Sequence, residues 1–343
     1  MFRFGIIGTG RIADRFAAEI KEAFSPKDIE IAAVYNPRLS SAESFAKRHG
    51  LTDAAVWTDD LDVFLHADGH GGAALDAVYV ASPHASHFAY AKAALAAGKH
   101  VLCEKPMTLR RSQAEELFFT AKKNGVFLME AMKTAFCPGF LSLMETAKSG
   151  VIGEVRDVEA TFTRLTDKGG REYTDAVFGG SFTEFGSYAL LPIFRLLGTD
   201  IVETEFKSLT EKNGADSYTK AYFTFADGFA QAKTGLGVKS EGQLLISGTK
   251  GYILAPSPWW LTKRYEIRFE DPRQVDAREF PFAGAGLRYE IAYFIEAAGK
   301  TGTSGETETA ERAVNAALLQ KETIARAGVM ERFLSEREAW AFT

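Results

Sequence analysis

The sequence predicts an α/β protein with a doubly wound parallel sheet at its N-terminus and a second, α+β domain with a mixed, largely antiparallel open sheet. Short apolar runs alternate with helical segments from residue 2 to about residue 129, as in βαβ units. Beyond residue 130, strand patterns follow one another without helices between them, which indicates antiparallel pairing. The length of 343 residues exceeds what one hydrophobic core usually supports. We therefore expect two domains, residues 1–130 and 131–343, with the final helices able to pack back onto the first.

The first domain is expected to contain five strands separated by helices. Ile12, Phe16 and Ile20 recur on one face of the first helix. Ser40 is expected to cap the second helix and Gly50 to end it. The expected strands are residues 2–7, 29–35, 77–81, 100–103 and 126–129. The expected helices are residues 11–23, 40–50, 59–66, 86–97 and 112–124, with a flexible loop at residues 68–72.

The second domain begins with a helix and continues as strands. Residues 155–165, 218–225 and 230–236 alternate polar and apolar side chains, the pattern of a half-buried strand. The remaining expected elements are a helix at residues 138–148, short strands at 244–246, 252–254 and 265–269, and closing helices at 287–299 and 309–327.

Composition and charge exclude several classes of protein. The chain is 46% hydrophobic and 25% charged, as in ordinary globular proteins. Its net charge of -5 disfavours nucleic acid or an anionic membrane as a partner. We see no apolar run of about 18 residues to span a bilayer, and no room for a leader before the strand at Phe2. The two cysteines, Cys103 and Cys137, fit reduced thiols, so we expect a soluble cytoplasmic protein.

A glycine-rich turn follows the first strand. Gly8, Thr9, Gly10, Arg11 and Ile12 precede an alanine, which gives the G-x-G-x-x-A form of a Rossmann dinucleotide-binding turn. In that form the first glycine makes the tight turn, the second admits a pyrophosphate, and the helix amino end donates N–H groups to it. A tight turn without a ligand is the alternative, because the motif alone has low specificity.

The end of the second strand bears on the choice between NAD and NADP. An acidic residue there binds the ribose 2′-hydroxyl of NAD, whereas an arginine accommodates the 2′-phosphate of NADP. This chain has Asn36, Pro37 and Arg38, with no carboxylate to repel a phosphate. The pattern favours NADP over NAD, with Asn36 and Arg38 as candidate contacts; the alternative is that Arg38 is only solvated surface.

A lysine follows another strand of the predicted sheet. Residues 100–103 run into Glu104, Lys105 and Pro106. The carboxyl ends of parallel strands share one edge of a sheet, and open α/β sheets bind ligands there. Lys105 and the glycine turn should therefore lie along the same edge, with an ammonium group beside a bound dinucleotide. This arrangement indicates redox chemistry rather than simple binding.

These motifs resemble the glucose–fructose oxidoreductase, inositol dehydrogenase and MocA family of nicotinamide-dependent sugar and polyol oxidoreductases. The similar segments, in the family's order, are the glycine turn, residues 81–87 (Ala-Ser-Pro-His-Ala-Ser-His), Glu104-Lys105-Pro106, residues 179–188 and residues 287–291. Residues 129–132 and the Cys137-Pro138 pair resemble the branch that contains dihydrodiol and D-xylose dehydrogenases. The resemblance implies further cofactor contacts from Ser82, Pro83, His87, Glu104 and Lys105.

Two positions depart from the family pattern. Glu184 stands where the family usually has aspartate, and Lys133 stands where the branch usually has tryptophan. The longer carboxylate and the added cation leave the substrate open. We take Lys133, Phe162 and Tyr173 as candidate substrate contacts.

Hydride transfer from a secondary alcohol needs a group that takes the hydroxyl proton. All six histidines lie in the first domain, so the second cannot supply a histidine for this step. Tyr188 occupies the position where the family has histidine or tyrosine, and a nearby cation such as Lys105 would favour its phenolate. Glu184 lies one helical turn earlier, on the same face. We expect Tyr188 to transfer the proton, Lys105 to orient the oxygen and Glu184 to position Lys105 or substrate; the alternative is that Tyr188 is a half-buried packing residue.

Two other functions are compatible with parts of the sequence. A cofactor-binding regulator without turnover would have no chemical need for Lys105, Glu184 and Tyr188 together. An NAD-dependent glycosidase of this family tends to carry histidine in place of Tyr188. We expect no metal, because His66, Asp68 and His70 lie among glycines without further ligands. We expect a homodimer or higher homo-oligomer through the C-terminal sheet, one face of which is too apolar for solvent.

Overall fold

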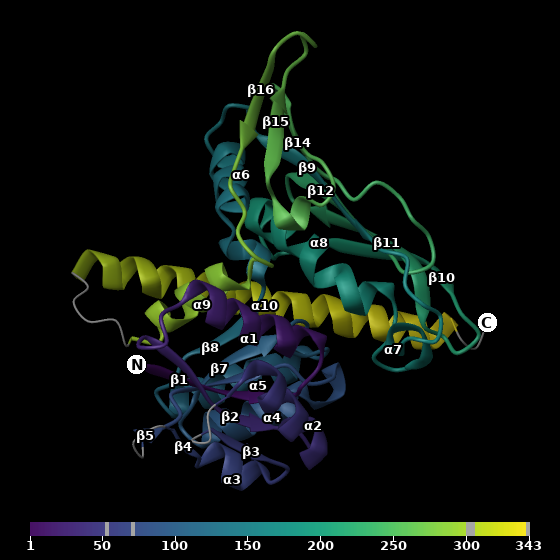
Figure 1. The fold of residues 1–343 in the computed structure, drawn as a ribbon. Coiled ribbons are helices and arrows are strands. Elements are labelled where there is room, and N and C mark those ends of the chain that lie inside the picture. The colour runs from purple at the N-terminus through teal and green to yellow at the C-terminus, as the bar shows by residue number, and fades with distance from the viewer. Residues whose placement is uncertain (52–54, 70–72, 300–305, 341–343) are drawn as a thin grey trace. The chain divides into compact units, whose positions relative to one another are not determined.

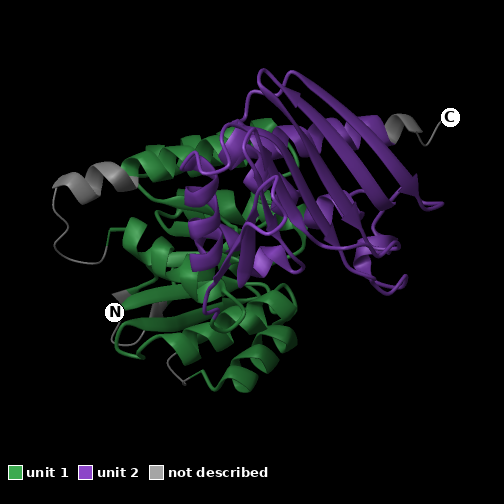
Figure 2. Ribbon diagram, turned by 90° about the horizontal axis from the view of Figure 1, so that it is seen from above, with its two compact units in different colours: residues 1–133, 283–324 green, residues 134–282, 325–343 purple. Residues whose placement is uncertain are grey.

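The computed structural model describes residues 1–51, 55–69, 73–299 and 306–340 (Figure 1). The chain forms two compact units, drawn in two colours in Figure 2. Unit 1 comprises residues 1–133 and 283–324, and unit 2 comprises residues 134–282 and 325–343. The sequence predicted a first domain of residues 1–130 onto which later helices could pack; the compact unit extends to residue 133 and includes residues 283–324.

Unit 1 is built on a six-stranded parallel sheet with the strand order β3-β2-β1-β6-β7-β8. Its strands are β1 (Phe2–Ile7), β2 (Ile29–Tyr35), β3 (Val56–Thr58), β6 (Ala77–Val80), β7 (His100–Glu104) and β8 (Leu128–Ala131). Every residue of β6 is buried, as expected for a strand covered on both faces. This is the order of a doubly wound dinucleotide-binding sheet, which confirms the predicted fold class.

The helices of unit 1 divide between the two faces of this sheet. They are α1 (Arg11–Ala23), α2 (Leu39–His49), α3 (Leu61–Leu65), α4 (His84–Ala96), α5 (Arg111–Lys123) and α9 (Leu287–Ala297). The strand order runs outward from β1 in one direction and from β6 in the other, so right-handed crossovers place the connecting helices on opposite faces. Accordingly, α1 packs with α2 and α9, whereas α4 packs with α5.

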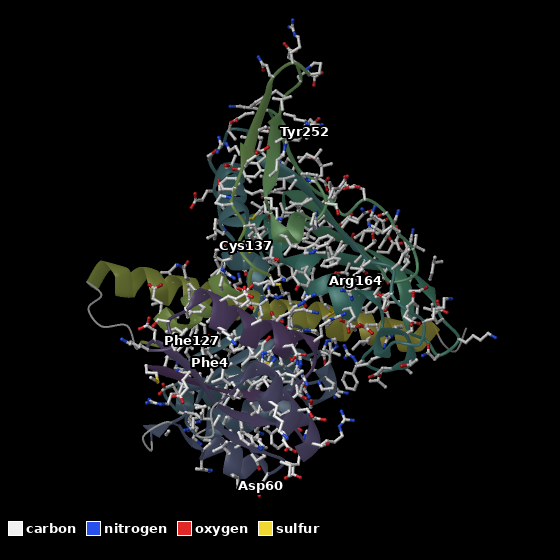
Figure 3. The ribbon with its side chains drawn as sticks, viewed as in Figure 1. Phe4, Asp60, Phe127, Cys137, Arg164 and Tyr252 are labelled. Carbon is white, nitrogen blue, oxygen red and sulfur yellow. The ribbon has the colours of Figure 1, made fainter. Side chains whose placement is uncertain are left out.

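An aromatic cluster explains why α9 belongs to unit 1. Phe294 of α9 has its ring 6.4 Å from that of Phe2, 5.9 Å from Phe4 and 5.7 Å from Phe127. Phe4 and Phe127 are labelled in Figure 3. Aromatic rings bury large apolar areas, so this cluster holds α9 against the start of the sheet.

A short hairpin, β4 (Asp68–Gly69) and β5 (Ala73–Ala74), lies where the sequence predicted a flexible loop. Residues 70–72 of that predicted loop, including His70, lie outside the described residues.

Unit 2 is built on an eight-stranded mixed sheet with the order β10-β11-β12-β9-β13-β14-β15-β16. Its strands are β9 (Val155–Thr163), β10 (Glu203–Thr210), β11 (Asp216–Phe225), β12 (Gly228–Gly235), β13 (Leu244–Gly248), β14 (Tyr252–Ala255), β15 (Arg264–Arg268) and β16 (Val275–Glu279). All neighbouring pairs are antiparallel except β12 and β9. The predicted open, largely antiparallel sheet is confirmed.

Helical segments accompany this sheet on one face. They are η1 (Lys133–Phe136), whose first residue belongs to unit 1, α6 (Pro138–Lys148), α7 (Arg171–Thr174), α8 (Ser181–Leu197), η2 (Trp259–Leu261) and the last part of α10 (Glu306–Trp340). Helix α8 packs on β9, β11 and β12. Helix α10 is longer than the predicted helix at residues 309–327 because Phe333, near its end, packs on Phe182 and Phe206.

Two strands of unit 2 were absent from the prediction, and both lie at the edges of the sheet. In β10 only Phe206 is buried, and in β16 no residue is fully buried. Edge strands are often polar because they face solvent, so they lack the apolar alternation on which the prediction relied. None of the helices in the described ranges combines the length and apolar character that a bilayer crossing requires.

Candidate functional site: a dinucleotide edge and an aromatic wall

The carboxyl ends of four strands in unit 1 are aligned. Ile7, at the end of β1, is paired with Tyr35 of β2 and with Val80 of β6. Val80 is in turn paired with Cys103 of β7. The glycine turn, Asn36, Ser82 and Lys105 each follow directly after one of these strands. The predicted cofactor residues therefore lie along a single edge, where open α/β sheets bind ligands.

The two glycines of the turn have different physical requirements. Gly8 has a φ of +98°, and a Cβ there would lie 2.6 Å from the carbonyl oxygen of Ala81, so no other residue fits. Gly10 has an ordinary φ of -84°, and a Cβ there would meet no protein atom within 4 Å. Backbone N–H groups at the amino end of α1 are therefore approachable from the open side of Gly10. Ala13, the third small residue, is fully buried and lets α1 pack closely on the sheet.

Thr9, Asn36 and Arg38 form a connected group at the end of β1 and β2. The Asn36 amide donates to the Thr9 hydroxyl at 2.8 Å, and the Arg38 backbone N–H donates to Asn36 Oδ1 at 2.9 Å. Asn36 is nearly buried, whereas Arg38 is exposed and lies at the N-cap position of α2 without a capping hydrogen bond from its side chain. Ser40, the predicted cap, lies inside the helix, which begins at Leu39. The fixed amide and the exposed guanidinium are suited to the ribose and its phosphate, respectively.

Glu104 supports the loop that carries Lys105. Its carboxylate accepts hydrogen bonds from the Tyr79 hydroxyl at 2.6 Å and from the Lys105 backbone N–H at 3.2 Å. Burial raises the pKa of Glu104, and the Lys105 ammonium and the Tyr79 hydroxyl oppose that rise. These contacts fix the backbone at Lys105, whose side chain is half-buried. A direct contact of Glu104 with the cofactor stays a prediction.

His87 joins two loops of this edge. Its side chain is 1% exposed, with Nδ1 2.9 Å from the Pro106 carbonyl oxygen and Nε2 2.8 Å from the Ser82 carbonyl oxygen. A neutral imidazole can donate to one of these carbonyls, and an imidazolium to both. His87 therefore fixes the loops after β6 and β7 from within the protein, and its predicted direct contact with the cofactor stays a prediction.

The predicted residues of unit 2 gather in an aromatic cluster. Phe162 is stacked between Trp260 at 3.6 Å and Phe185 at 4.3 Å. Tyr188 packs against Phe162 at 5.2 Å between ring centroids, and Tyr173 belongs to the same cluster. Tyr188 is half-buried, so the predicted packing alternative describes part of its environment. The cluster forms an apolar wall of stacked rings, and apolar and aromatic side chains predominate in small-ligand pockets.

Glu184 lies in the first turn of α8 and is paired with Arg171 of α7. The distance between Arg171 Nη2 and Glu184 Oε1 is 2.8 Å, and the Glu184 side chain is 9% exposed. Arg164, labelled in Figure 3, lies with its guanidinium 5.5 Å from the centre of the Phe185 ring. Two arginines therefore adjoin the aromatic cluster and its carboxylate, an arrangement the sequence did not indicate.

Lys133, predicted as a substrate contact, has a backbone partner in unit 1. Its ammonium donates to the carbonyl oxygen of Ala285 at 2.7 Å. This hydrogen bond does not test the predicted contact of Lys133 with substrate, which stays a prediction. Among the residues that the structure describes, no group of three histidine, cysteine, aspartate or glutamate side chains could hold a metal ion.

The comparison with protein families places the chain. Residues 2–132 match the model of the GFO/IDH/MocA oxidoreductase family described as an NAD-binding Rossmann fold, and residues 140–254 match the C-terminal domain of the same family. The chain belongs to the GFO/IDH/MocA family of oxidoreductases. This confirms the predicted family and an enzyme that uses a nicotinamide dinucleotide.

Similar curated proteins agree with membership of the GFO/IDH/MocA family. The scyllo-inositol 2-dehydrogenase (NADP(+)) IolU of Bacillus subtilis is 30% identical over 340 residues, which cover 96% of this chain and 98% of that protein. The trans-1,2-dihydrobenzene-1,2-diol dehydrogenase of Bos taurus is 27% identical and covers 86% of this chain and 87% of its own. These relatives do not favour the two alternatives, a regulator without turnover and a glycosidase.

Solved structures show the same architecture. KijD10, a 3-ketoreductase from Actinomadura kijaniata solved with NADP and TDP-benzene, matches with a TM-score of 0.77 and 25% identity over 96% of both chains. That protein has also been solved with one lysine replaced by alanine and with one tyrosine replaced by phenylalanine. The aldose-aldose oxidoreductase of Caulobacter crescentus shares the fold with a TM-score of 0.80 at 19% identity, covering 99% of this chain and 98% of its own.

Arg164, Arg171 and Trp260 of the aromatic cluster escaped the sequence analysis, as did Glu290 of α9, a buried carboxyl group whose pKa burial and the Glu104 charge raise. Arg171, the partner of Glu184, lies 13 positions before it, a spacing that signals no contact. Trp260 could have been noticed, because two adjacent tryptophans at positions 259 and 260 are unusual in a short connection. Glu290 lies in residues 287–291, one of the segments that resemble the family, but the helix pattern did not predict that its side chain is buried.

Proposed function

We propose that this protein transfers hydride between NADP(H) and a secondary alcohol or carbonyl of a polyol, a sugar or a related vicinal diol. The observation that carries the proposal is the single sheet edge on which the glycine turn, the Asn36–Arg38 group and Lys105 follow adjacent strands. The names of the relatives, which act on an inositol and on a dihydrobenzene diol, support a substrate with neighbouring carbon–oxygen bonds.

The preference for NADP rests on the end of β2. No carboxylate stands at residues 36–38, so nothing there repels a 2′-phosphate. The exposed Arg38 guanidinium offers a charge-assisted hydrogen bond to that phosphate. The NADP in the name of IolU and in the KijD10 complex supports the same choice.

Domain roles follow from the two sets of residues. We assign residues 1–130 to dinucleotide binding and residues 131–343 to substrate binding and self-association. Phe162 and Tyr173 would line the substrate site, where a stacked aromatic wall favours the apolar face of a ring.

The chemistry needs one proton transfer for each hydride. In the oxidative direction a bound nicotinamide would supply the acceptor for the carbinol hydride, and the Tyr188 phenolate would take the O–H proton. A carbonyl forms, and the reductive direction reverses each step. Lys105 would orient the oxygen and stabilise the charge that develops on it. Glu184, held by Arg171, would position substrate or Lys105.

A second copy of the chain is the proposed partner of the sheet in unit 2. The face away from α8 carries charged side chains, so it is not the apolar face that the sequence predicted. Lys220 and Lys233 are direct neighbours across β11 and β12, and Asp157 and Glu159 lie two residues apart on β9. Burial and the adjacent Lys220 lower the pKa of Lys233, and burial and Glu159 raise the pKa of Asp157. Two copies related by a two-fold axis could set the cationic pair of each against the anionic pair of the other.

The self-association has a direct test. Sedimentation is expected to show a dimer or larger assembly at micromolar concentration, weakened in the Lys220→Glu, Lys233→Glu double variant. A stable monomer of the unmodified chain would overturn this part of the proposal. Two buried cysteines without disulfides, Cys103 and Cys137, support a reducing, cytoplasmic location.

A panel of polyols, sugars and cyclic diols tests the function. Each compound is offered with NAD and with NADP, and the corresponding ketones with the reduced cofactors, while nicotinamide absorbance is followed. We expect turnover with at least one vicinal diol or its ketone and a higher kcat/KM with the phosphorylated cofactor. Binding of NADPH without turnover on any compound of these classes would favour a regulator and overturn the proposal.

A further inference from the structure

The chain returns to unit 1 through residues 283–290, here called the return segment. It precedes and begins α9, and it contacts α1, the helix that follows the glycine turn. The Ala285 backbone N–H donates to the Glu19 carboxylate, and Arg288 Nε donates to the same carboxylate at 2.5 Å. Arg288 also lies 3.4 Å from Glu22. Charge-assisted contacts of this kind are the stronger hydrogen bonds of proteins.

Gly284 makes this close contact possible. Its φ is +56°, and a Cβ there would lie 2.1 Å from Glu19 Oε1 and 2.4 Å from Arg288 Nη2. Any side chain would therefore clash with the ion pair and strain the backbone. Glu19 is 3% exposed, so the return segment covers this carboxylate of α1.

Lys133 binds the next peptide group of the return segment, through the same residue. Its ammonium donates to the Ala285 carbonyl oxygen at 2.7 Å, while the N–H of Ala285 faces Glu19. Lys133 follows β8, which pairs with β7 through Ala131 and Glu104. One residue of the return segment thus bridges helix α1 and the strands that carry the lysine loop.

The charge of Lys133 also acts on the lysine loop. Its ammonium favours the ionised form of Glu104, the carboxylate that accepts from the Lys105 backbone N–H. It does the same for Glu290 of α9, which is 1% exposed and whose pKa burial and the charges of Glu104 and Glu19 raise. The charge of Lys133 therefore favours the ionised form of two buried carboxyl groups, while its ammonium donates a hydrogen bond to the return segment.

We propose that Lys133 is a positioning residue that ties the end of β8, and with it the paired end of β7 that carries the Lys105 loop, to helix α1 through Ala285. The proposal rests on the function proposed above, since it concerns the placement of Lys105 against a cofactor held at the amino end of α1. It gives Lys133 a role inside unit 1 in place of the predicted substrate contact. Without the tie, Lys105 and the nicotinamide keep their places less firmly, and small displacements of reacting groups cost large factors in rate.

Four proteins test the proposal: the unmodified chain, Lys133→Met, Lys133→Arg and Lys99→Met. Lys99 is the matched control, because its ammonium also donates to a backbone carbonyl, that of Leu75 at 3.1 Å, but it lies at the opposite end of β7. Each protein is measured for kcat, KM, NADPH affinity, thermal unfolding and the fluorescence spectrum of bound NADPH.

We expect Lys133→Met to lower kcat by about 10- to 100-fold, with KM and the NADPH Kd within about threefold of the unmodified values. Its bound NADPH spectrum should differ from that of the unmodified protein, because the surroundings of the nicotinamide change. Lys133→Arg should keep most of the unmodified kcat and most of the unmodified NADPH spectrum. Lys99→Met should leave kcat and the spectrum unchanged. A rise in KM with kcat preserved would assign Lys133 to substrate binding and overturn the proposal.

Failure of the two proposals can be told apart. If the unmodified protein turns over no substrate, the proposed function fails, and the NADPH spectra still decide the role of Lys133. Identical spectra for the unmodified protein and Lys133→Met, or an equal change in Lys99→Met, would then contradict the positioning role.

Discussion

Under the proposed function, the two units of the molecule would contribute to the chemistry by different means. In unit 1 the decisive features are backbone features: Gly8 at a φ of +98°, the open space over Gly10, and aligned strand ends. In unit 2 the decisive features are side chains, such as Phe162 stacked between two rings and Glu184 paired with Arg171. A site built from backbone groups suits the phosphates of the cofactor, which are the same whatever the substrate.

This contrast indicates which unit can change its substrate specificity. Backbone N–H groups at a helix amino end bind any pyrophosphate, so unit 1 can stay the same while substrates differ. An aromatic cluster beside a buried carboxylate that pairs with an exposed arginine depends on each of its members, so single substitutions in unit 2 should alter which substrate binds. The predictions below test this contrast, beginning with the largest expected effect.

The glycine turn gives the sharpest test of a backbone site. Gly10→Ala should leave the thermal unfolding of the free protein unchanged, since its Cβ meets no protein atom within 4 Å, and should weaken NADPH binding by about 100-fold or more, because the methyl group occupies the approach of the pyrophosphate. Gly8→Ala should instead lower the unfolding temperature, because its Cβ would meet Ala81. Calorimetry with and without NADPH separates the two. Unchanged NADPH affinity in Gly10→Ala would place the pyrophosphate elsewhere.

Arg38 tests the choice of cofactor. Arg38→Ala should raise the Kd of NADPH by about 10- to 100-fold, the equivalent of about 1.5–3 kcal/mol for a hydrogen bond to a charged group, and leave the Kd of NADH unchanged. The control is Arg48→Ala, which removes an arginine of α2 that pairs with Asp14 instead. Equal losses for both cofactors would remove Arg38 from phosphate recognition.

Arg171 tests the side-chain site of unit 2. Arg171→Met takes away the cation that holds the Glu184 carboxylate, and we expect kcat/KM to fall about tenfold or more with NADPH affinity preserved. Arg164→Met is the control, because Arg164 lies over the Phe185 ring; its effect should be smaller. If the two variants behave alike, the ion pair with Glu184 has no special role.

Glu290 gives the smallest effect and the clearest sign. Burial raises its pKa well above the ordinary 4.5, the Glu104 charge adds to the rise, and Lys133 opposes it. The folded protein then keeps a proton that the unfolded chain loses, so this group lowers stability as pH rises from about 4.5 through the folded pKa. Glu290→Gln does not titrate. Its unfolding temperature relative to the unmodified protein should therefore climb with pH across that range, by about 2–4 °C for each kcal/mol.

The control for Glu290 is Glu43→Gln on the surface of α2, where the carboxylate pairs with Lys47. A difference in unfolding temperature that stays constant with pH in Glu290→Gln, or the same slope in Glu43→Gln, would mean that burial of Glu290 is not responsible.

The fold of unit 1 could be predicted because its signals are local. Buried parallel strands are short apolar runs, and Gly8 and Gly10 have a spacing that a turn dictates. Three edge strands could not be predicted: β10 and β16 of unit 2, and β3 of unit 1, a sixth strand where the sequence predicted five. Strands exposed at a sheet edge often lack apolar alternation. Arg171 and Trp260 were missed for another reason: their contacts with Glu184 and Phe162 arise only when distant segments pack.

The central claim is that Lys105 of unit 1 and Tyr188 of unit 2 act on the same reacting oxygen. Single-turnover hydride transfer in Lys105→Met, Tyr188→Phe and the double variant tests it most directly. Each single variant should lose about 10²- to 10⁴-fold in rate, with cofactor binding nearly intact, and the double variant should lose little more than the slower single, since groups that act as a unit are not additive. A loss in the double variant equal to the product of the single losses, or full activity in Tyr188→Phe, would contradict the claim.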